Sequence, residues 1–430
     1  MTGGPRVRLL DHERDLLLRL LAEPTVNPLE NGRPGGLWPA QHAYAEAAAR
    51  LGLTVAHHAP AQPEYATRAD VPLAVRRAAA QDSAFLAEQP NLVLRLGRCP
   101  TASTVMFNVH LDTVDGDEPV GFDGARFTGR GAVDAKGPAV ALLAGIRAAV
   151  EADPAIGRDV GVLVQAVAGE EGGAMGTIGT RPLVEAGHYG RLNVFCEPTG
   201  LRYLTRATAA MTACVSARGS DAVDDQPGAG HNATVLLGFL AQHLAHTLST
   251  TDTRVCVAGL HTGLMHNRVY GTGQLLLNLA YATTPAGARL ESAVHTALDE
   301  GIAEFAARFA GVDGFARTAR DAAVVTTLEW HKRGLPALSG DDPWCAALLA
   351  RAGVAAWPAD EPAFTCDAIW LHGLPGVSTV VLGPGTLAGN NAHAYGEYVE
   401  LDDLERFAAT VAAILRCFAS DRTAHGRGAR

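Results

Sequence analysis

The 430-residue sequence lacks the features that would place a protein in a membrane, on nucleic acid or in a secretory route. No apolar run approaches the ~20 residues that a membrane-spanning helix requires. No block of lysine and arginine stands out, and the formal net charge is -10, which argues against nucleic acid as a partner. Residues 1–21 carry charges within their apolar part and show no clear cleavage site, so they do not indicate a signal peptide.

Cysteine is also scarce. The chain has seven cysteines, scattered singly, and no C-x-x-C pair. This pattern excludes a disulfide framework and a cysteine zinc site, and it predicts reduced thiols in a cytoplasmic protein. Apolar residues make up 48% of the chain and charged residues 19%, which is typical of a soluble globular protein, and the length favours two domains.

Apolar segments of strand length alternate with helical segments in the first half of the chain. The expected strands cover residues 91–97, 103–112, 159–169 and 191–198, and an expected helix covers residues 136–153. This alternation is typical of an α/β domain, in which helices flank a sheet. We expect residues 1–205 to form the first part of this domain and residues 334–430 to form its second part.

Two segments depart from this alternation. Residues 58–90 are rich in alanine and proline, and we expect them to form an insertion or flap. Residues 206–333 follow the order strand, helix, strand, strand, helix, strand, which predicts a smaller α+β domain of ferredoxin-like type. The predicted fold class is therefore α/β, with a mixed sheet flanked by helices and interrupted by a smaller α+β domain.

Carboxylate and imidazole side chains gather where the predicted strands end. Because sites in parallel α/β sheets form outside the carboxyl ends of strands, we expect these side chains to meet. The candidates at these strand ends are His110, Asp112, Asp134, Glu170, Glu171 and Glu197, and the segment "NNAHAYGEY" near the end of the sequence adds His393.

These residue types point to metal chemistry. Two histidines and several carboxylates form a mixed nitrogen and oxygen set that suits zinc or a similar divalent ion. A shared aspartate would allow two metals ~3.5–4 Å apart, a geometry used in aminopeptidases. Glu170 and Glu171 are adjacent at a strand tip, where neighbours point to opposite faces, so we expect them to have different roles.

The order of these motifs resembles that of a known family. The segments "PTVNP", "HLDTV", "GRGAVDAKG", "GEEGG", "EPTG" and "CDAIW…GPG…NNAHAYGEYVEL" follow one another along nearly the whole chain. By these segments the chain resembles the zinc-dependent metallopeptidase family that includes aminoacylases, acetylornithine deacetylase, succinyl-diaminopimelate desuccinylase and glutamate carboxypeptidases. The resemblance implies a catalytic α/β domain and a lid domain, residues 206–333, that often makes a dimer contact.

The resemblance also implies a role for each candidate. Two Zn²⁺ ions, with Co²⁺ or Mn²⁺ as alternatives, would share Asp134 as a bridge. His110 and Glu197 would complete one metal site, and Glu171 and His393 would complete the other. Asp112 would orient His110. Glu170 would be the general base, which takes a proton from the attacking water and delivers it to the leaving amine.

The lid segment departs from the family pattern at two positions. In "GSDAVDDQPGAGHNAT", the position of the family's oxyanion-holding histidine falls on Val223, which has no hydrogen-bond donor in its side chain. In "HNRVYGTGQLLLNLAYAT", Asn267 remains, but the position of the arginine that reads a substrate carboxylate falls on Ala280. Either nearby groups substitute, or the substrate is unlike an N-acyl amino acid. The candidate substitutes are His231, His261, His266 and Arg268.

Three functional hypotheses follow. The first is a cytoplasmic di-zinc amidohydrolase that cleaves a small N-acyl amino acid, a dipeptide-like compound or a related metabolite. The second, motivated by Val223 and Ala280, is a specialised biosynthetic enzyme that uses the same centre for acyl transfer or cyclisation. The third is a non-catalytic binding protein. The expected partners are a small-molecule substrate and a second copy of the chain bound through the lid, with neither nucleic acid nor membrane.

Overall fold

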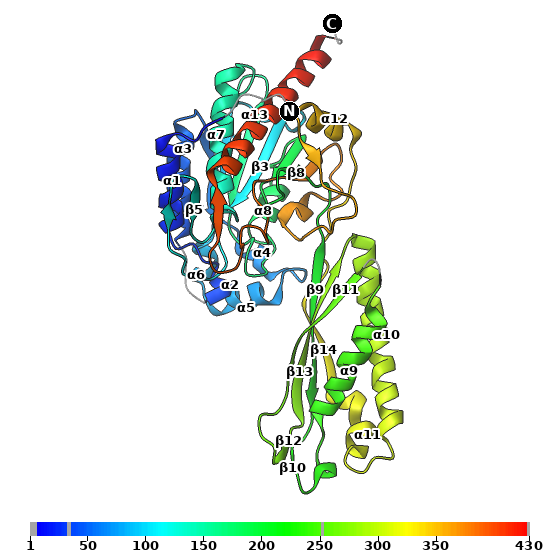
Figure 1. The fold of residues 1–430 in the computed structure, drawn as a ribbon. Helices are drawn as coiled ribbons and strands as arrows, with labels where there is room; N and C mark the ends of the chain where they lie inside the picture. Colours follow the sequence, from blue (N-terminus) through cyan, green and yellow to red (C-terminus); the bar gives the residue numbers. More distant parts are fainter. Residues whose placement is uncertain (1–6, 32–35, 251–252, 428–430) are drawn as a thin grey trace. The chain divides into compact units, whose positions relative to one another are not determined.

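The computed structural model describes residues 7–31, 36–250 and 253–427, and it divides into two compact units (Figure 1). The large unit comprises residues 1–207 and 338–430, and the small unit comprises residues 208–337. Ala207 and Leu338 exchange two backbone hydrogen bonds of 3.0 Å at the point where the chain leaves and re-enters the large unit. The observed division therefore lies two to four residues beyond the expected boundaries at 206 and 333.

The large unit is built on a six-stranded mixed sheet. Its strand order is β1-β2-β6-β3-β7-β16. Their bounds are β1 Thr54–Pro60, β2 Pro90–Leu96, β3 Thr104–His110, β6 Gly161–Val167, β7 Leu192–Phe195 and β16 Ser378–Val381. The central strands β6, β3, β7 and β16 are parallel, whereas β1 and β2 pair antiparallel at one edge. Every residue of β3 and β6 is buried, as expected of parallel strands covered on both faces.

Helices of very different lengths flank this sheet. They are α1 Asp11–Ala22, α3 Leu37–Ala49, α7 Lys136–Ala152, α8 Thr180–Glu185, α12 Pro343–Arg351 and α13 Leu401–Arg427. Helices α7 and α13 lie side by side (Figure 1), and their apolar faces share one hydrophobic core with β2, β3, β6 and β7. Gly145 of α7 makes this close approach feasible, because a Cβ atom there would collide with Ala408 and Val411 of α13.

Residues 58–90 contain three short helices between β1 and β2. These are α4 Pro63–Thr67, α5 Leu73–Gln81 and α6 Ala84–Ala87. We refer to residues 61–87 as the helical insert. Its apolar side chains form a separate small core with two residues that follow β6. The buried members of this core are Ala61, Ala66, Val71, Val75, Phe85, Ala174 and Ile178.

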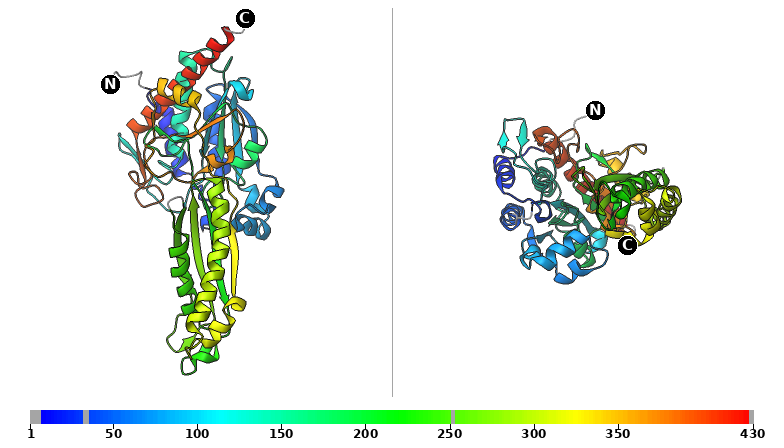
Figure 2. Two further views of the ribbon diagram at one scale, coloured as in Figure 1. Left: turned by 90° about the vertical axis from the view of Figure 1, so that its right-hand side faces the viewer. Right: turned by 90° about the horizontal axis from the view of Figure 1, so that it is seen from below.

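The small unit is an α+β domain of ferredoxin-like type. Its four antiparallel strands have the order β11-β13-β9-β14. Their bounds are β9 Ala209–Arg218, β11 Thr253–His261, β13 Thr272–Tyr281 and β14 Thr326–Lys332. The helices are α9 Ala233–Leu248, α10 Thr284–Phe309 and α11 Ala316–Val325. Helices α9 and α10 pack on each other and on this sheet (Figure 2), so the predicted fold class is confirmed.

Short elements complete the chain. They are α2 Pro28–Asn31, β4 Gly121–Phe122, β5 Arg126–Thr128, β8 Arg202–Tyr203, β10 Ala222–Val223, β12 Arg268–Val269, β15 Ala355–Ala356, β17 Tyr398–Glu400, and the 3-10 helices η1 Thr101–Ser103, η2 Pro227–Ala229 and η3 Asp367–Leu371. No helix within residues 7–31, 36–250 and 253–427 combines the length and the apolar character needed to cross a membrane.

Candidate metal centre

His110 is the last residue of β3 and lies at the carboxyl end of the central sheet. Its ring is fully buried and is held at both nitrogens. Nδ1 lies 2.9 Å from the main-chain oxygen of Asp112, and Nε2 lies 2.9 Å from Oδ1 of Asp134. The ring therefore has one orientation, with Nε2 directed at the aspartate.

Asp134 lies at the meeting point of two histidines. Its second oxygen, Oδ2, is 3.2 Å from Nε2 of His393, so one carboxylate faces both imidazoles. Although burial opposes the change, hydrogen bonds from His110 and His393 lower the pKa of Asp134. This is the arrangement expected of a carboxylate that is shared between two metal ions.

Glu171 and His393 form the other side of the cluster. Nε2 of His393 lies 2.9 Å from Oε1 of Glu171. The backbone of His393 is left-handed, with φ of 62°, which turns the ring toward the carboxylates from a loop before β17. Hydrogen bonds to Asp134 and Glu171 raise the pKa of His393 to about 10. These contacts join the carboxyl-terminal segment to the strand-end loops.

Glu197 closes the cluster on the side of His110. It follows β7, is almost fully buried, and places Oε1 3.9 Å from Nε2 of His110. Burial, together with the neighbouring Asp134 carboxylate, raises the pKa of Glu197 to about 8. Single ligand atoms of His110, Asp134 and Glu171 also lie within 4.8 Å of one another. The structure thus brings all five predicted ligands together.

Glu170 has a different environment from its neighbour Glu171. Its carboxylate makes no hydrogen bond or ion pair within the described part of the chain. Burial raises its pKa, and the nearby charge of Glu171 raises it further. Glu171 is held by His393, whereas Glu170 is available to a molecule that enters the site.

The donor set fits a pair of divalent cations. Three buried carboxylates, from Asp134, Glu171 and Glu197, surround the buried imidazole of His110, and the half-exposed imidazole of His393 contacts two of them. Buried charges of one sign are stable only when they are paired or coordinate metals, and imidazole with carboxylate is a set that zinc and related ions prefer.

The sequence profile of Peptidase family M20/M25/M40 matches residues 106–416. The chain belongs to this family. It is therefore a hydrolase of the metallopeptidase type that acts on amide bonds. The predicted family resemblance and the predicted enzyme class are confirmed.

Solved structures share the fold at low identity. An M20 family metallo-carboxypeptidase from Sulfolobus solfataricus has a TM-score of 0.70 at 13% identity, covering 96% of this chain and all of its own. Aminopeptidase PepT from Bacillus cereus has a TM-score of 0.68 at 16% identity, covering 95% of this chain and 98% of its own. A dinuclear metal-binding M20 peptidase from Bacillus subtilis has a TM-score of 0.59 at 11% identity, covering 94% and 97%.

Asp112 of this M20 chain acts on His110 through its main chain and on Glu171 through its side chain. The main-chain oxygen contacts Nδ1 of His110, whereas the nearest carboxylate oxygen is 3.8 Å away. The other carboxylate oxygen accepts the side-chain N–H of Asn27 at 2.9 Å and the backbone N–H of Glu171 at 3.1 Å. Asn27 also donates to the main-chain oxygen of Glu171 at 3.1 Å.

A second buried carboxylate, Glu397, holds the loop that carries Asp134. One of its oxygens accepts the backbone N–H groups of Val133 and Asp134 at 3.0 and 3.3 Å. The other accepts the N–H of Gly131 at 3.1 Å and the guanidinium of Arg130 at 2.7 Å. Because Glu397 follows His393 in the sequence, it connects the segments of two predicted ligands.

Sequence reasoning did not identify Asn27, Glu397 or a third residue, Asp367. Asp367 is fully buried and accepts the hydroxyl of Thr180 at 2.6 Å, and burial raises its pKa to about 7. Each of these residues lies inside a segment that carried the family resemblance, namely "PTVNP", "GEY" and "CDAIW". That position is the signal that could have found them.

The candidate substrate-binding residues all belong to the small unit, whereas the predicted metal ligands belong to the large unit. His231 is buried, accepts the backbone N–H of Ser220 at 2.9 Å and pairs with Asp321 at 3.2 Å, so it has a structural role there. Arg268 pairs with Asp221. The remaining candidates, His261, His266 and Asn267, are exposed.

The two departures from the family pattern are visible in the small unit. Val223 lies on β10 with 57% of its surface exposed and pairs with Arg268 of β12. Ala280 lies on β13 directly opposite Arg254 of β11. Neither position carries a side chain that can donate a hydrogen bond.

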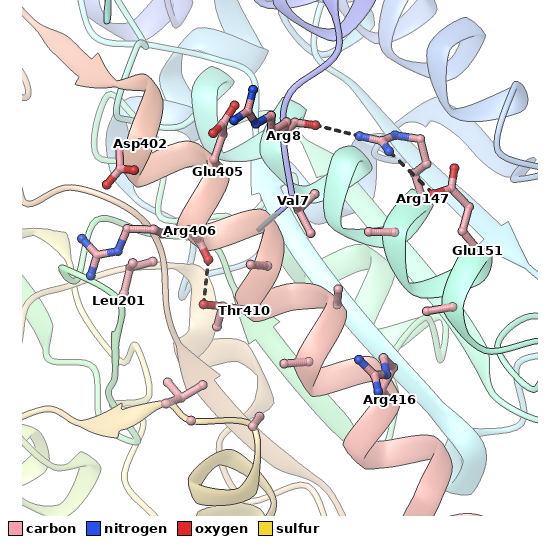
Figure 3. Close-up of a pocket in the computed structure, with 18 of the residues that line it drawn as sticks. Val7, Arg8, Arg147, Glu151, Leu201, Asp402, Glu405, Arg406, Thr410 and Arg416 are labelled. Carbon is pink, nitrogen blue, oxygen red and sulfur yellow. Dashed lines mark hydrogen bonds and ion pairs between the residues drawn. The ribbon is translucent and has the colours of Figure 1, made fainter. Parts of the chain in front are cut away.

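A separate cavity of about 980 Å³ lies elsewhere in the large unit (Figure 3). It is bordered by α7, α13 and the start of the described chain, where Arg147 donates to the main-chain oxygen of Arg8 at 3.0 Å. Arg406 and Arg416 also line this cavity. None of the five predicted metal ligands lines it, so it is distinct from the candidate metal centre.

Proposed function

We propose that this M20 chain is a di-zinc amidohydrolase that cleaves an amide bond in a small N-acyl amino acid, a dipeptide-like compound or a related metabolite. The observation that carries the proposal is the position of the Asp134 carboxylate between His110 and His393. Structures of similar fold are described as an aminopeptidase, a tripeptidase and human carnosine dipeptidase 1, which favours a short peptide or a related amide as the substrate.

Two sets of residues would hold the metals. His110, Asp134 and Glu197 would form one set, and Asp134, Glu171 and His393 would form the other. When bound, the metal pair supplies Lewis acidity toward the scissile carbonyl and toward water. Zinc is favoured over Co²⁺ or Mn²⁺ by the two imidazole ligands, since nitrogen donors suit zinc well.

Glu170 would carry the proton. As the carbon–oxygen bond to water forms, its carboxylate accepts a proton from that water. As the carbon–nitrogen bond breaks, it delivers this proton to the leaving nitrogen, which departs as the free amine. The absence of a hydrogen-bond partner among the described residues leaves Glu170 available for this role, whereas Glu171 is engaged by His393.

Substitution of the two neighbouring glutamates tests the proposal. Glu170→Gln should retain its metal and lose turnover by about 10²–10⁴-fold, since that is the usual contribution of a general base. Glu171→Gln should lose metal as well as activity. A near-normal rate for Glu170→Gln on N-acetyl amino acids, N-succinyl amino acids or dipeptides would exclude this mechanism.

A second candidate function is favoured by the small unit. Val223 and Ala280 stand where the family has a histidine and an arginine, so the substrate of this chain can differ from an N-acyl amino acid. The same centre would then serve an acyl transfer or a cyclisation in biosynthesis. Fast hydrolysis of any of the N-acetyl or N-succinyl amino acids named above counts against this candidate. A metal-loaded chain that hydrolyses none of them supports it.

We also propose a cytoplasmic homodimer, with a small molecule as the substrate and with neither nucleic acid nor membrane as a partner. All seven cysteines are free thiols, which fits a reducing compartment. Strand β11 is at the edge of the small unit's sheet and exposes Val257 and Leu260, and such edges readily pair with another chain.

Light scattering after size exclusion tests the dimer. The native chain should have about twice the monomer mass, and Val257→Asp on β11 should be monomeric, because edge charges block strand pairing. Val324→Asp is the control, since Val324 is exposed on α11 of the same unit and away from the edge strand. A monomeric native chain, or a Val257→Asp dimer, would rule out pairing through β11.

A further inference from the structure

Residues 168–179, which we call the glutamate loop, connect β6 to α8 and carry Glu170 and Glu171. Both ends of the glutamate loop are tied by one side chain, Asn91 of β2, which is 1% exposed. The amide oxygen of Asn91 accepts the backbone N–H of Ala168 at 3.0 Å, and its nitrogen donates to the main-chain oxygen of Ile178 at 2.8 Å. A single amide therefore sets the separation of the two ends.

Further contacts hold the middle of the glutamate loop by its backbone. The N–H of Gly176 donates to the oxygen of Gly169 at 2.7 Å, which closes the loop on itself. The indole of Trp370, from η3, donates to the oxygen of Met175 at 2.7 Å. None of these contacts involves the carboxylate of Glu170.

The helical insert packs on the same loop. Ala174 and Ile178 of the glutamate loop are members of the insert's apolar core, and neither is more than 1% exposed. Two ion pairs fix the insert to α8, directly after the loop. Arg181 pairs with Asp70 at 2.8 Å, and Arg68 pairs with Glu185 at 2.8 Å.

We infer that Asn91 and the helical insert position the glutamate loop, so that Asn91 is a positioning residue for Glu170 and Glu171. The inference rests on the proposed function for its effect on catalysis. The backbone of the loop determines where the two carboxylates lie, and a misplacement of ~1 Å in a catalytic group can lower a rate by about 10²-fold. The insert thus acts on the reaction through the backbone of the glutamate loop.

Asn91→Asp is the direct test. The aspartate is isosteric and still accepts from Ala168, but it places a second acceptor against the oxygen of Ile178, which should displace that end of the loop. We expect kcat to fall about 10–100-fold with KM changed by less than about threefold, since a misplaced base impairs the chemical step more than binding. Zinc affinity should also fall about tenfold, because Glu171 lies on the same loop.

Asn193→Asp is the matched control. Asn193 of β7 is fully buried and ties the main chain at Gly190 and Ser378 in the same manner, with contacts of 2.8–3.1 Å, but it does not touch the glutamate loop. It should lose stability to a similar extent while retaining kcat per folded molecule. A kcat for Asn91→Asp that matches that of Asn193→Asp would overturn the inference.

A double-mutant cycle separates positioning from general structural damage. If Asn91 acts through Glu170, Asn91→Asp should lower the residual rate of Glu170→Gln by less than about twofold, because the two effects share one group. Should Asn91→Asp not fold, Val75→Ala in the insert's core replaces it, with the same expected pattern. Full additivity in the cycle, together with unchanged zinc affinity, would reject the role.

The failure of this inference differs from the failure of the proposed function. If Asn91→Asp retains the native kcat while Glu170→Gln is inactive, only the positioning role is rejected. A chain that cleaves none of the amides rejects the proposed reaction, and the zinc affinity of Asn91→Asp relative to Asn193→Asp then tests the positioning of Glu171 alone.

Discussion

The carboxylate of Asp112 accepts the backbone N–H of Glu171 at 3.1 Å. This hydrogen bond connects the loop after β3, which follows His110, to the loop after β6, which carries Glu171. Two predicted metal ligands from different strand ends are thereby fixed relative to each other by one aspartate. The histidine ring is oriented by the main chain of the same residue.

Removal of this carboxylate should weaken metal binding. We expect Asp112→Ala to lower zinc affinity about 10–100-fold, as loss of a group that orients metal ligands usually does. Asp112→Asn should have a smaller effect, because its amide oxygen still accepts from Glu171. Competition titration with a chelating dye measures both variants. Asp115→Asn, an exposed position on the same loop, is the control. Native affinity in Asp112→Ala would contradict the assigned role.

Glu397→Gln should loosen the segment that carries Asp134. A glutamine directs an N–H₂ group at donors that the carboxylate accepts, so we expect a loss of about 1–3 kcal/mol in the free energy of unfolding. Zinc affinity should fall about 10–100-fold. Chemical denaturation and zinc titration provide the two readings. Glu400→Gln is the control, because it removes only a more exposed ion pair with Arg126. It should change neither the free energy of unfolding nor the zinc affinity.

Two glycines of the glutamate loop should respond differently to alanine. Gly173 and Gly176 both have a positive φ, at 73° and 60°. A Cβ atom at Gly173 meets open space, whereas at Gly176 it would collide with the buried carboxylate of Asp367. We expect Gly173→Ala to lower the free energy of unfolding by about 1–2 kcal/mol, because alanine is strained at a positive φ. Gly176→Ala should cost about 3–5 kcal/mol. Equal unfolding free energies would contradict the close contact.

The ion pairs that join the insert to α8 predict a pH dependence. The Arg68 guanidinium, with help from Arg181, lowers the pKa of Glu185 from 4.5 to about 2. Because the folded-state pKa is the lower one, the stabilisation is complete above about pH 4.5 and is lost as the pH falls toward 2.

Glu185→Gln measures this contribution. The side chain of Glu185 is 39% exposed, so its ion pairs are screened by solvent. We therefore expect the free energy of unfolding of the native chain to exceed that of the variant by only about 0.5–1 kcal/mol at pH 7. At pH 3 the difference should fall to less than half of that value. Urea denaturation of both proteins at the two pH values gives the comparison, and a difference that does not shrink at pH 3 would refute the assignment.

The sequence was sufficient to predict the two kinds of domain and to select the five side chains, proposed as ligands, that the structure brings together. Buried apolar runs such as those of β3 and β6 carry a clear local signal, and His110, Glu171 and Glu197 lie at or shortly after the ends of such strands. His393 does not follow one of these strands, and nothing in its local sequence predicts a contact with Asp134, so only the family resemblance implied its place in one particular metal site.

The positioning contacts could not be predicted in this way. Asn91 and Ile178 are 87 positions apart, and neither residue type by itself signals a loop clamp. His231 illustrates the opposite case. Its residue type suggested a substrate contact, but its ring is buried against Asp321, 90 positions away, a partner that no local pattern reveals.

The metal content of the purified chain tests the central claim most directly. After dialysis against zinc, inductively coupled plasma mass spectrometry should find about two zinc ions per native chain, since one bridging aspartate serves both. His393→Ala should retain about one, and Asp134→Asn should lose both. A native chain that binds no zinc, cobalt or manganese, or a His393→Ala variant that still holds two zinc ions, would contradict the account.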